Sequence, residues 1–197
     1  KNNVLIKTRY TQPAIFIHSI ALNILLNKKD IYPDIVAGHS LGEFSALVSA
    51  GVINFEDALK IIKIRSTQMS NASKKISGGM AAIIGANKNQ LDIICNQNGI
   101  VVPANYNSPN QTVISGELNA INQSIITAKK IGIKRAIKLN VSGAFHSPLM
   151  KEANLSLNKA INSVNFNNSN FALYQNIYPN EIFDGKKIKE NLKNQLC

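Results

Sequence analysis

A five-residue segment, Gly38 to Gly42 (G-H-S-L-G), narrows the possible folds of this chain more than any other part of its sequence. The apolar run Ile35 to Ala37 comes directly before it, and a helix-forming segment of small residues, Leu41 to Ala50, follows. A buried strand, a sharp turn and a helix in this order are typical of α/β proteins. The spacing therefore predicts an α/β fold in which the turn exposes the side chain of Ser40.

The two glycines of this turn have a predicted steric role. Because the chain turns sharply from strand to helix, we expect side chains at Gly38 and Gly42 to collide with neighbouring backbone. Ser40 then stands at the tip of the turn, beside a helix N-terminus where the N–H of Leu41 can stabilise developing negative charge. The pattern indicates a serine nucleophile, and a tight strand-to-helix turn with a capping serine is the alternative.

Short strand-like runs alternate with helical periods along most of the chain. Between residues 77 and 142 the expected order is β-α-β-β-α-β, which is typical of ferredoxin-like folds. We therefore predict an α/β-hydrolase-like parallel-sheet core made of residues 1–76 and 143–197, with a ferredoxin-like subdomain inserted at residues 77–142. The expected helices span 13–26, 41–50, 55–69, 89–97 and 118–131, with one more from residue 148. The expected strands span 35–37, 80–84, 100–104, 111–115, 134–141 and 171–175.

Charge and composition exclude several classes of protein. The 197 residues carry a formal net charge of +11, but the lysines and arginines occur in ones and twos. This scatter argues against nucleic-acid and membrane binding, while the positive charge favours an acidic protein partner. No stretch is apolar enough to span a membrane, and residues 1–10 lack the apolar centre of a signal peptide, so we expect a cytoplasmic protein. Cys95 and Cys197 have neither disulfide nor metal-ligand spacing, so we expect no metal site.

A serine nucleophile needs a neighbouring base, and the chain has three histidines. His18 lies within a helical pattern, and His39 is adjacent to the serine on a sharp turn, where neighbouring side chains diverge. His146 follows a predicted strand and loop, and the Ser-Pro pair at 147–148 predicts a helix start directly after it. Catalytic groups of α/β proteins lie in such loops, and the helix terminus favours a neutral imidazole. His146 is therefore the predicted base, and a loop histidine that caps the sheet edge is the alternative.

The acidic residues between Ser40 and His146 argue against a full triad. α/β-Hydrolases usually place an Asp or Glu between the serine and the histidine in chain order, where it orients the imidazole. None of the candidates follows a convincing core strand; they are Glu43, Glu56, Asp57, Asp92 and Glu117. We therefore predict a Ser-His dyad in which a backbone carbonyl or an amide holds the histidine.

Arg65 falls in the apolar stripe of the helix predicted at residues 55–69. Burial of an unpaired guanidinium is strongly unfavourable, so Arg65 needs a carboxylate. Two sources are open. The carboxylate belongs either to an internal Asp or Glu, or to a substrate that the guanidinium grips in bidentate geometry.

These residues and their surroundings resemble the malonyl-CoA:acyl-carrier-protein transacylase family of bacterial fatty-acid biosynthesis. The resemblance covers nearly the whole chain, and its matching segments are Thr11 to Ala14, Ala37 to Ala50, Gly51 to Ile53, Arg65, Gly79 to Gly85, Asn105 to Gln111 and Phe145 to Lys151. It implies a hydrolase-like core with a ferredoxin-like insert. It also implies Ser40 as the acylated nucleophile, His146 as the base and Arg65 as the clamp for a malonyl carboxylate.

Three further residues, Asn105, Asn107 and Gln111, match a family loop near the acyl pocket, and the resemblance implies that they bind substrate. Turn formation around Ser108 and Pro109 is the alternative.

The resemblance implies transfer of a malonyl group from malonyl-CoA to the phosphopantetheine thiol of an acidic acyl carrier protein, by a monomer without a cofactor. The family's opening strand and glycine-glutamine loop are missing at the start of the chain, and its Asn-Pro-Val segment is missing at the end, so we expect a core shortened at both ends. A serine esterase or thioesterase of the same fold, or an inactive shortened core, are the alternatives.

Overall fold

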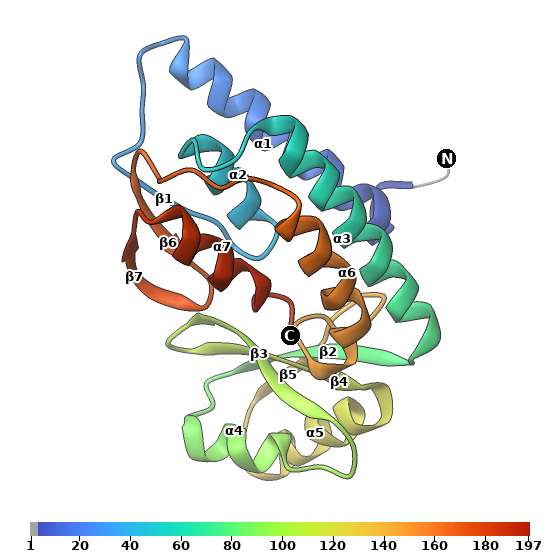
Figure 1. The fold of residues 1–197 in the computed structure, drawn as a ribbon. Coiled ribbons are helices and arrows are strands. Elements are labelled where there is room, and N and C mark those ends of the chain that lie inside the picture. Colours follow the sequence, from blue (N-terminus) through green and yellow to red (C-terminus); the bar gives the residue numbers. More distant parts are fainter. Residues whose placement is uncertain (1–3) are drawn as a thin grey trace. The chain divides into compact units, whose positions relative to one another are not determined.

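The computed structural model describes residues 4–197, so the first three residues of the predicted core lie outside the described part. The chain divides into two compact units. The first contains residues up to Gln68 together with Asn154–Gln195, and the second contains Met69–Ala153 and the last two residues. Figure 1 shows the elements of each unit along the coloured chain.

A three-stranded sheet forms the centre of the first unit, with the order β1-β6-β7. β1 (Ile35–Ala37) pairs in parallel with β6 (Ala172–Gln175), and Val36 lies opposite Leu173. β7 (Tyr178–Ile182) returns antiparallel to β6. The predicted strands at 35–37 and 171–175 are therefore neighbours, although about 130 residues separate them along the chain.

Helices surround this sheet within the first unit. The elements are the 3₁₀ turn η1 (Val4–Ile6), α1 (Thr8–Asn27), α2 (Gly42–Ser49), residues 55–68 of α3 (Phe55–Lys75), most of α6 (Lys151–Asn162) and α7 (Gly185–Lys193). α2 packs on β1 and β6, and α7 packs on β6 and β7. The predicted cap of α3 is confirmed, because the Asn54 Oδ1 accepts the Asp57 N–H at 2.8 Å.

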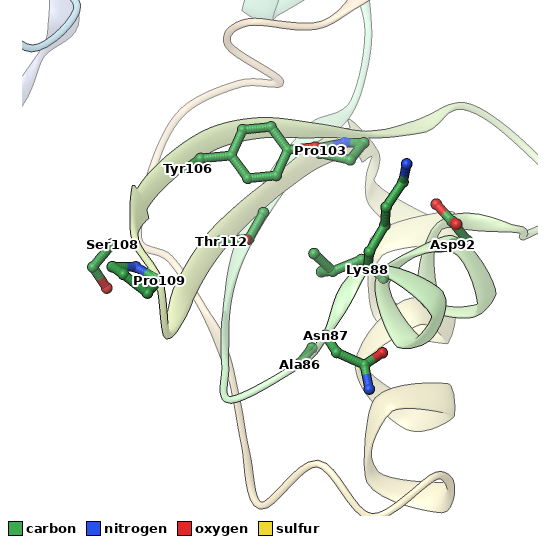
Figure 2. Close-up of a pocket in the computed structure, with 10 residues that line it drawn as sticks. Ala86, Asn87, Lys88, Asp92, Pro103, Tyr106, Ser108, Pro109 and Thr112 are labelled. Atoms are coloured by element: carbon green, nitrogen blue, oxygen red, sulfur yellow. The ribbon is translucent and has the colours of Figure 1, made fainter.

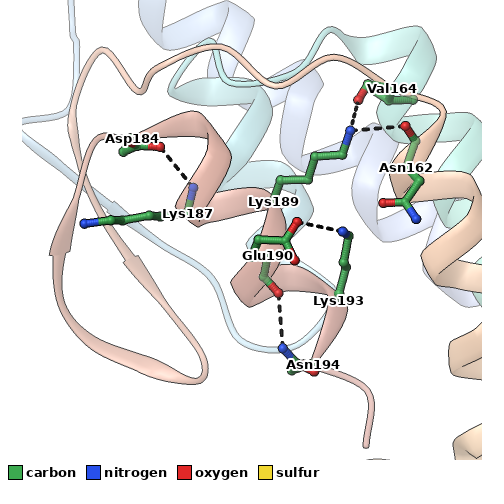
Figure 3. Close-up of polar contacts among 8 residues, drawn as sticks. All are labelled: Asn162, Val164, Asp184, Lys187, Lys189, Glu190, Lys193 and Asn194. Carbon is green, nitrogen blue, oxygen red and sulfur yellow. Dashed lines mark hydrogen bonds and ion pairs between the residues drawn. The ribbon is translucent and has the colours of Figure 1, made fainter.

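The α7 helix was not predicted, and neither was β7, because an Asn-rich tail gave no apolar period to detect. Asp184 caps α7 by accepting the N–H groups of Lys186 and Lys187. Within the helix, Lys189 Nζ donates to the carbonyls of Asn162 and Val164 at 3.2 and 2.6 Å, as Figure 3 shows. Side chains fold back onto local carbonyls in this way, so lysines of the tail also have a structural role.

The second unit contains a four-stranded antiparallel sheet with the order β3-β4-β2-β5. In chain order its elements are β2 (Gly78–Ile84), α4 (Lys88–Cys95), β3 (Val101–Ser108), β4 (Gln111–Glu117), α5 (Leu118–Lys130) and β5 (Arg135–Lys138), followed by the 3₁₀ turn η2 (Pro148–Met150). This order of strands and helices is the one expected from the sequence. β5 is shorter than the predicted strand 134–141, and the chain leaves the sheet after Lys138.

Alternation along β2 explains how this sheet buries both faces. Ala81 and Ile83 belong to the apolar core beneath α4 and α5, which lie on the same side of the sheet. Met80 and Ala82 point to the other face, where Phe145 packs against them. Successive strand residues point to opposite faces, so one strand serves two apolar clusters.

The bounds of the second unit differ from those of the predicted subdomain, which lies inside it. Close contacts bind the flanking segments to the sheet. A methyl group at Gly78 would lie 2.7 Å from the Ala144 backbone N, and one at Gly143 would lie 2.0 Å from the Ser73 Oγ. The division of the chain into a core and an insert at 77–142 stays a prediction. No helix among residues 4–197 is long and apolar enough to cross a membrane.

Candidate functional site

The turn between β1 and α2 holds Ser40 in a left-handed conformation, with φ at +51°. Only a few per cent of non-glycine residues adopt such a φ, and they concentrate at functional sites. Gly38 is required for this turn, because a methyl group there would lie 2.0 Å from the carbonyl carbon and oxygen of Gly42. The predicted collision at Gly42 is wrong. A methyl group there meets no atom within 4 Å, since the close approach is made by the Gly42 backbone and not by its hydrogens.

Asn176, directly after β6, fastens this turn. Its Oδ1 accepts the N–H of Ser40 at 2.6 Å, and its Nδ2 donates to the carbonyl of Gly38 at 2.6 Å. One amide thus satisfies a donor and an acceptor on either side of His39 and compensates for the unusual backbone at the serine. Sequence analysis missed Asn176, because its partner lies 136 residues away and no periodic pattern marks it.

The N–H of Leu41 differs from that of Ser40, because it makes no hydrogen bond to any residue in the range 4–197. Leu41 is the N-cap of α2, and its carbonyl accepts the N–H of Phe44 at 3.1 Å. A backbone N–H at this position adds to the partial positive charge of the helix N-terminus. The predicted role of Leu41 as an oxyanion donor is compatible with this geometry and stays a prediction.

Arg65 lies in the apolar stripe of α3, as predicted, and its side chain is only 1% exposed. Its Nη2 donates to the Ser40 Oγ at 2.9 Å, and its Nη1 donates to the Gln12 Oε1 at 2.6 Å. A second, longer bond at 3.3 Å joins Nη2 to the Gln195 Oε1. Phe44 covers the guanidinium with its ring centroid at 5.7 Å. The guanidinium is thus held directly beside the predicted nucleophile.

The internal ion pair considered for Arg65 is absent, because no carboxylate among residues 4–197 lies within salt-bridge distance of it. Its Nε also has no hydrogen-bond partner in that range. Burial lowers the pKa of Arg65 to about 10, and the charge of Glu43 opposes that shift. The guanidinium is therefore still charged at neutral pH, although its direct partners are neutral amides and a hydroxyl.

Glu43 is the nearest compensating charge, and sequence analysis assigned it no role. It lies in the first turn of α2 and is 1% exposed. Its Oε1 accepts from the Gln175 Nε2 at 2.9 Å, while its Oε2 accepts from the Gln195 Nε2 at 2.8 Å and from the backbone N–H of Asn176 at 3.2 Å. Burial raises the pKa of Glu43, and these donors together with Arg65 oppose the rise. A buried acid in the G-H-S-L-G-E run was the available signal for this network.

His146 belongs to the second unit, whereas Ser40 belongs to the first. The chain at His146 is left-handed, with φ at +56°, and Ser147 forms the predicted cap by accepting the N–H of Leu149 at 3.3 Å. The Ser147 Oγ also donates to the Ala144 carbonyl at 2.7 Å, which fixes the loop before the histidine. The pairing of His146 with Ser40 stays a prediction.

The three predicted substrate-binding residues lie on the hairpin of β3 and β4, in the second unit. Asn107 Nδ2 donates to the Gln111 Oε1 at 2.9 Å across the hairpin, and Asn105 pairs with Val113 in the strand register. The alternative reading, a turn around Ser108 and Pro109, describes this geometry well. A substrate role for Asn105, Asn107 and Gln111 stays a prediction.

The second unit also contains a pocket of about 690 Å³ between α4 and the hairpin. Figure 2 shows Tyr106 and Pro103 along one side and Lys88 and Asp92 on the helix opposite. None of the three predicted substrate-binding residues lines this pocket. It is therefore separate from the residues that the sequence singled out.

Comparison with known proteins relates the whole chain to one family. The family described as "Acyl transferase domain" matches residues 1–194. The malonyl CoA-acyl carrier protein transacylase of Staphylococcus aureus (strain MSSA476) is 40% identical over 194 residues, which cover 96% of this chain and 62% of that protein.

Two solved structures are similar throughout the chain. The malonyl CoA-acyl carrier protein transacylase of Coxiella burnetii superposes with a TM-score of 0.94 at 34% identity and covers 99% of this chain and 63% of its own. A malonyl-transacylase in complex with its type II PKS acyl-carrier protein superposes with a TM-score of 0.93 at 36% identity and covers 100% and 65%. This chain thus spans slightly less than two thirds of the length of these relatives.

Proposed function

This chain belongs to the acyl transferase domain family, and from that premise we propose that it transfers a malonyl group from malonyl-CoA to the phosphopantetheine thiol of an acyl carrier protein through an ester on Ser40. The named relatives support the substrate, since two of them are malonyl CoA-acyl carrier protein transacylases. The complex of a similar malonyl-transacylase with an acyl-carrier protein supports the acceptor.

The contact of Arg65 with the Ser40 Oγ, at 2.9 Å, is the observation that carries the proposal. A malonyl thioester attacked by Ser40 has a carboxylate two bonds beyond its reacting carbonyl carbon. A buried guanidinium that already touches the nucleophile is placed to bind that carboxylate, and its internal partners are neutral. Binding of an anionic acyl group would supply the carboxylate that a buried arginine requires.

The chemistry then has two halves. In the first, the Ser40 Oγ attacks the thioester carbonyl, its proton passes to the base, and the C–S bond breaks to release the coenzyme A thiol, which takes a proton back. In the second, the carrier thiol attacks the Ser40 ester and restores the free hydroxyl. We assign the base to His146 and the stabilisation of the oxyanion to the N–H of Leu41, which has no internal acceptor among the described residues.

An acidic acceptor protein is part of the proposal, and the charge of the second unit supports it. Residues 118–151 contain six lysines and arginines and no Asp or Glu. Five of these cations are exposed, on the end of α5 and on the edge strand β5: Lys129, Lys130, Lys134, Arg135 and Lys138. Such a face accelerates encounter with an acidic partner. A monomeric state, a cytoplasmic location and the absence of a cofactor stay predictions from the sequence.

Covalent labelling tests the proposal directly. Incubation with malonyl-CoA should add the mass of one malonyl group to the protein, mapped to Ser40 by peptide analysis, and Ser40→Ala should abolish it. Addition of an acyl carrier protein that bears phosphopantetheine should then remove the label and malonylate the carrier. A labelled protein that releases free malonate at the same rate with and without the carrier would instead indicate a thioesterase. A folded wild-type chain that takes no label would contradict the proposal.

A further inference from the structure

The buried charges of the first unit, Glu43 and Arg65, are joined through the side chain of Gln195. Gln195 is itself 5% exposed and lies two residues after the end of α7. Its Nε2 donates to the Glu43 Oε2 and to the carbonyl of Ser40, both at 2.8 Å, and its Oε1 accepts from Arg65. One amide therefore contacts the acid, the arginine and the backbone of the nucleophile.

The direction of this amide follows from its neighbours and not from the density of contacts alone. The Ser40 carbonyl and the ionised Glu43 side chain can only accept hydrogen bonds, so only the nitrogen of Gln195 can face them. The oxygen of Gln195 must then face Arg65, whose guanidinium can only donate. Glu43 is in turn held by Gln175 and by the Asn176 N–H, so it cannot rotate without losing donors.

We propose that Gln195 is a positioning residue that sets the selectivity for acyl groups with a carboxylate, by holding Arg65 against Ser40 while keeping Glu43 one amide away from the guanidinium. A direct pair between Glu43 and Arg65 would neutralise the arginine and compete with the substrate carboxylate. With Gln195 between them, the charges compensate at a distance and the guanidinium keeps its affinity for an anion. The inference rests on the proposed function, in which Arg65 binds the malonyl carboxylate.

Gln195→Met tests this role, because methionine has a similar length but no amide. Rates of Ser40 labelling would be measured by intact-protein mass with malonyl-CoA and with acetyl-CoA, each at several pH values between 6 and 9. We expect the ratio of the malonyl to the acetyl rate to fall about tenfold, since a hydrogen bond to a charged group is lost. Ser169→Ala is the matched control, because Ser169 is buried in the same unit and bonds to Phe171 instead of the network. It should change the ratio by less than about twofold.

A double-mutant cycle separates positioning from general stability. If Gln195 acts through Arg65, then Gln195→Met should leave the ratio unchanged in an Arg65→Ala background. An unchanged ratio in the single variant, or an equal fall with and without Arg65, would overturn the inference.

Malonate binding provides a second measurement that needs no acylation. Malonate should raise the Tm of the wild-type chain more than acetate does, and Gln195→Met should remove that difference. If the wild type takes no label but shows this Gln195-dependent stabilisation, the proposed function fails and the inference stands. If malonate and acetate act alike on the wild type, the inference is wrong as well.

Discussion

The first unit keeps its functional groups in a buried polar cluster, whereas the second unit is organised around an apolar one. In the first, Glu43, Arg65, Gln175 and Gln195 are each 5% exposed or less and bond to one another or to the serine turn. In the second, the core beneath α4 and α5 consists of alanine, valine, leucine and isoleucine. Buried polar groups are costly when any partner is lost, while apolar contacts weaken gradually. Changes in the first unit should therefore be abrupt and selective, and changes in the second graded and general.

Removal of the guanidinium should have the largest effect. We expect Arg65→Ala to reduce Ser40 labelling by malonyl-CoA about 10²–10³-fold, because a charged contact to the acyl carboxylate is lost. Labelling by acetyl-CoA should change far less. Quenched-flow labelling and intact-mass analysis measure both rates. Equal losses with the two thioesters would mean that Arg65 supports the fold and not the acyl group.

A methyl group at each glycine of the turn gives a matched pair of variants. Gly38→Ala should destabilise the protein by about 3 kcal/mol or more, because its Cβ would overlap the Gly42 carbonyl at 2.0 Å. Gly42→Ala should change the free energy of unfolding by less than about 1 kcal/mol, since its Cβ meets no atom within 4 Å. Urea unfolding measures both. Similar losses in the two variants would contradict the one-sided packing of this turn.

In the second unit, Ile121→Val should cost about 1 kcal/mol of unfolding free energy, because it removes one buried methylene from the core beneath the sheet. Under conditions where the variant is fully folded, the ratio of malonyl to acetyl labelling should equal that of the wild type. A shift in that ratio would show that selectivity depends on the packing of the second unit as well.

The smallest effect is a pH dependence from Glu43. Its pKa in the folded protein is raised by burial, so the folded state favours the protonated form. The corresponding stability is fully present below the unfolded pKa, near 4.5, and is lost as the pH rises through the raised folded value. Glu43→Gln cannot ionise, so its free energy of unfolding should fall less than that of the wild type between pH 4 and 7. Parallel urea-unfolding curves at pH 4, 5, 6 and 7 would rule out the expected shift.

Local patterns in the sequence predicted the parts of the site that lie within a few residues of each other. The G-H-S-L-G run predicted the strand, the turn and the exposed serine, and the apolar period around Arg65 predicted its burial. Those inferences depend on spacings of two to four residues, which fix the face of a helix or strand. The helix around Pro13 begins earlier than predicted, at Thr8, because tertiary packing tolerates a proline near its N-terminus.

Long-range partners could not be predicted in this way. Gln195 and Asn176 contact the serine turn from positions 155 and 136 residues away, and a lone amide gives no periodic signal. The Asn-rich tail looked irregular for the same reason, although it supplies β7, α7 and two amides of the polar cluster. The partner of an isolated buried charge is the part of a site that a single sequence least reveals.

The short distance between Arg65 and Ser40 has a consequence for chemical probes of this protein. Reagents that report on serine enzymes usually carry a reactive phosphorus or carbonyl centre on a greasy tail. Here such a tail would be pressed against a desolvated cation, which binds apolar groups poorly. We expect an electrophile with an anionic arm of two or three atoms to tag this chain in a mixture where uncharged reagents pass it by.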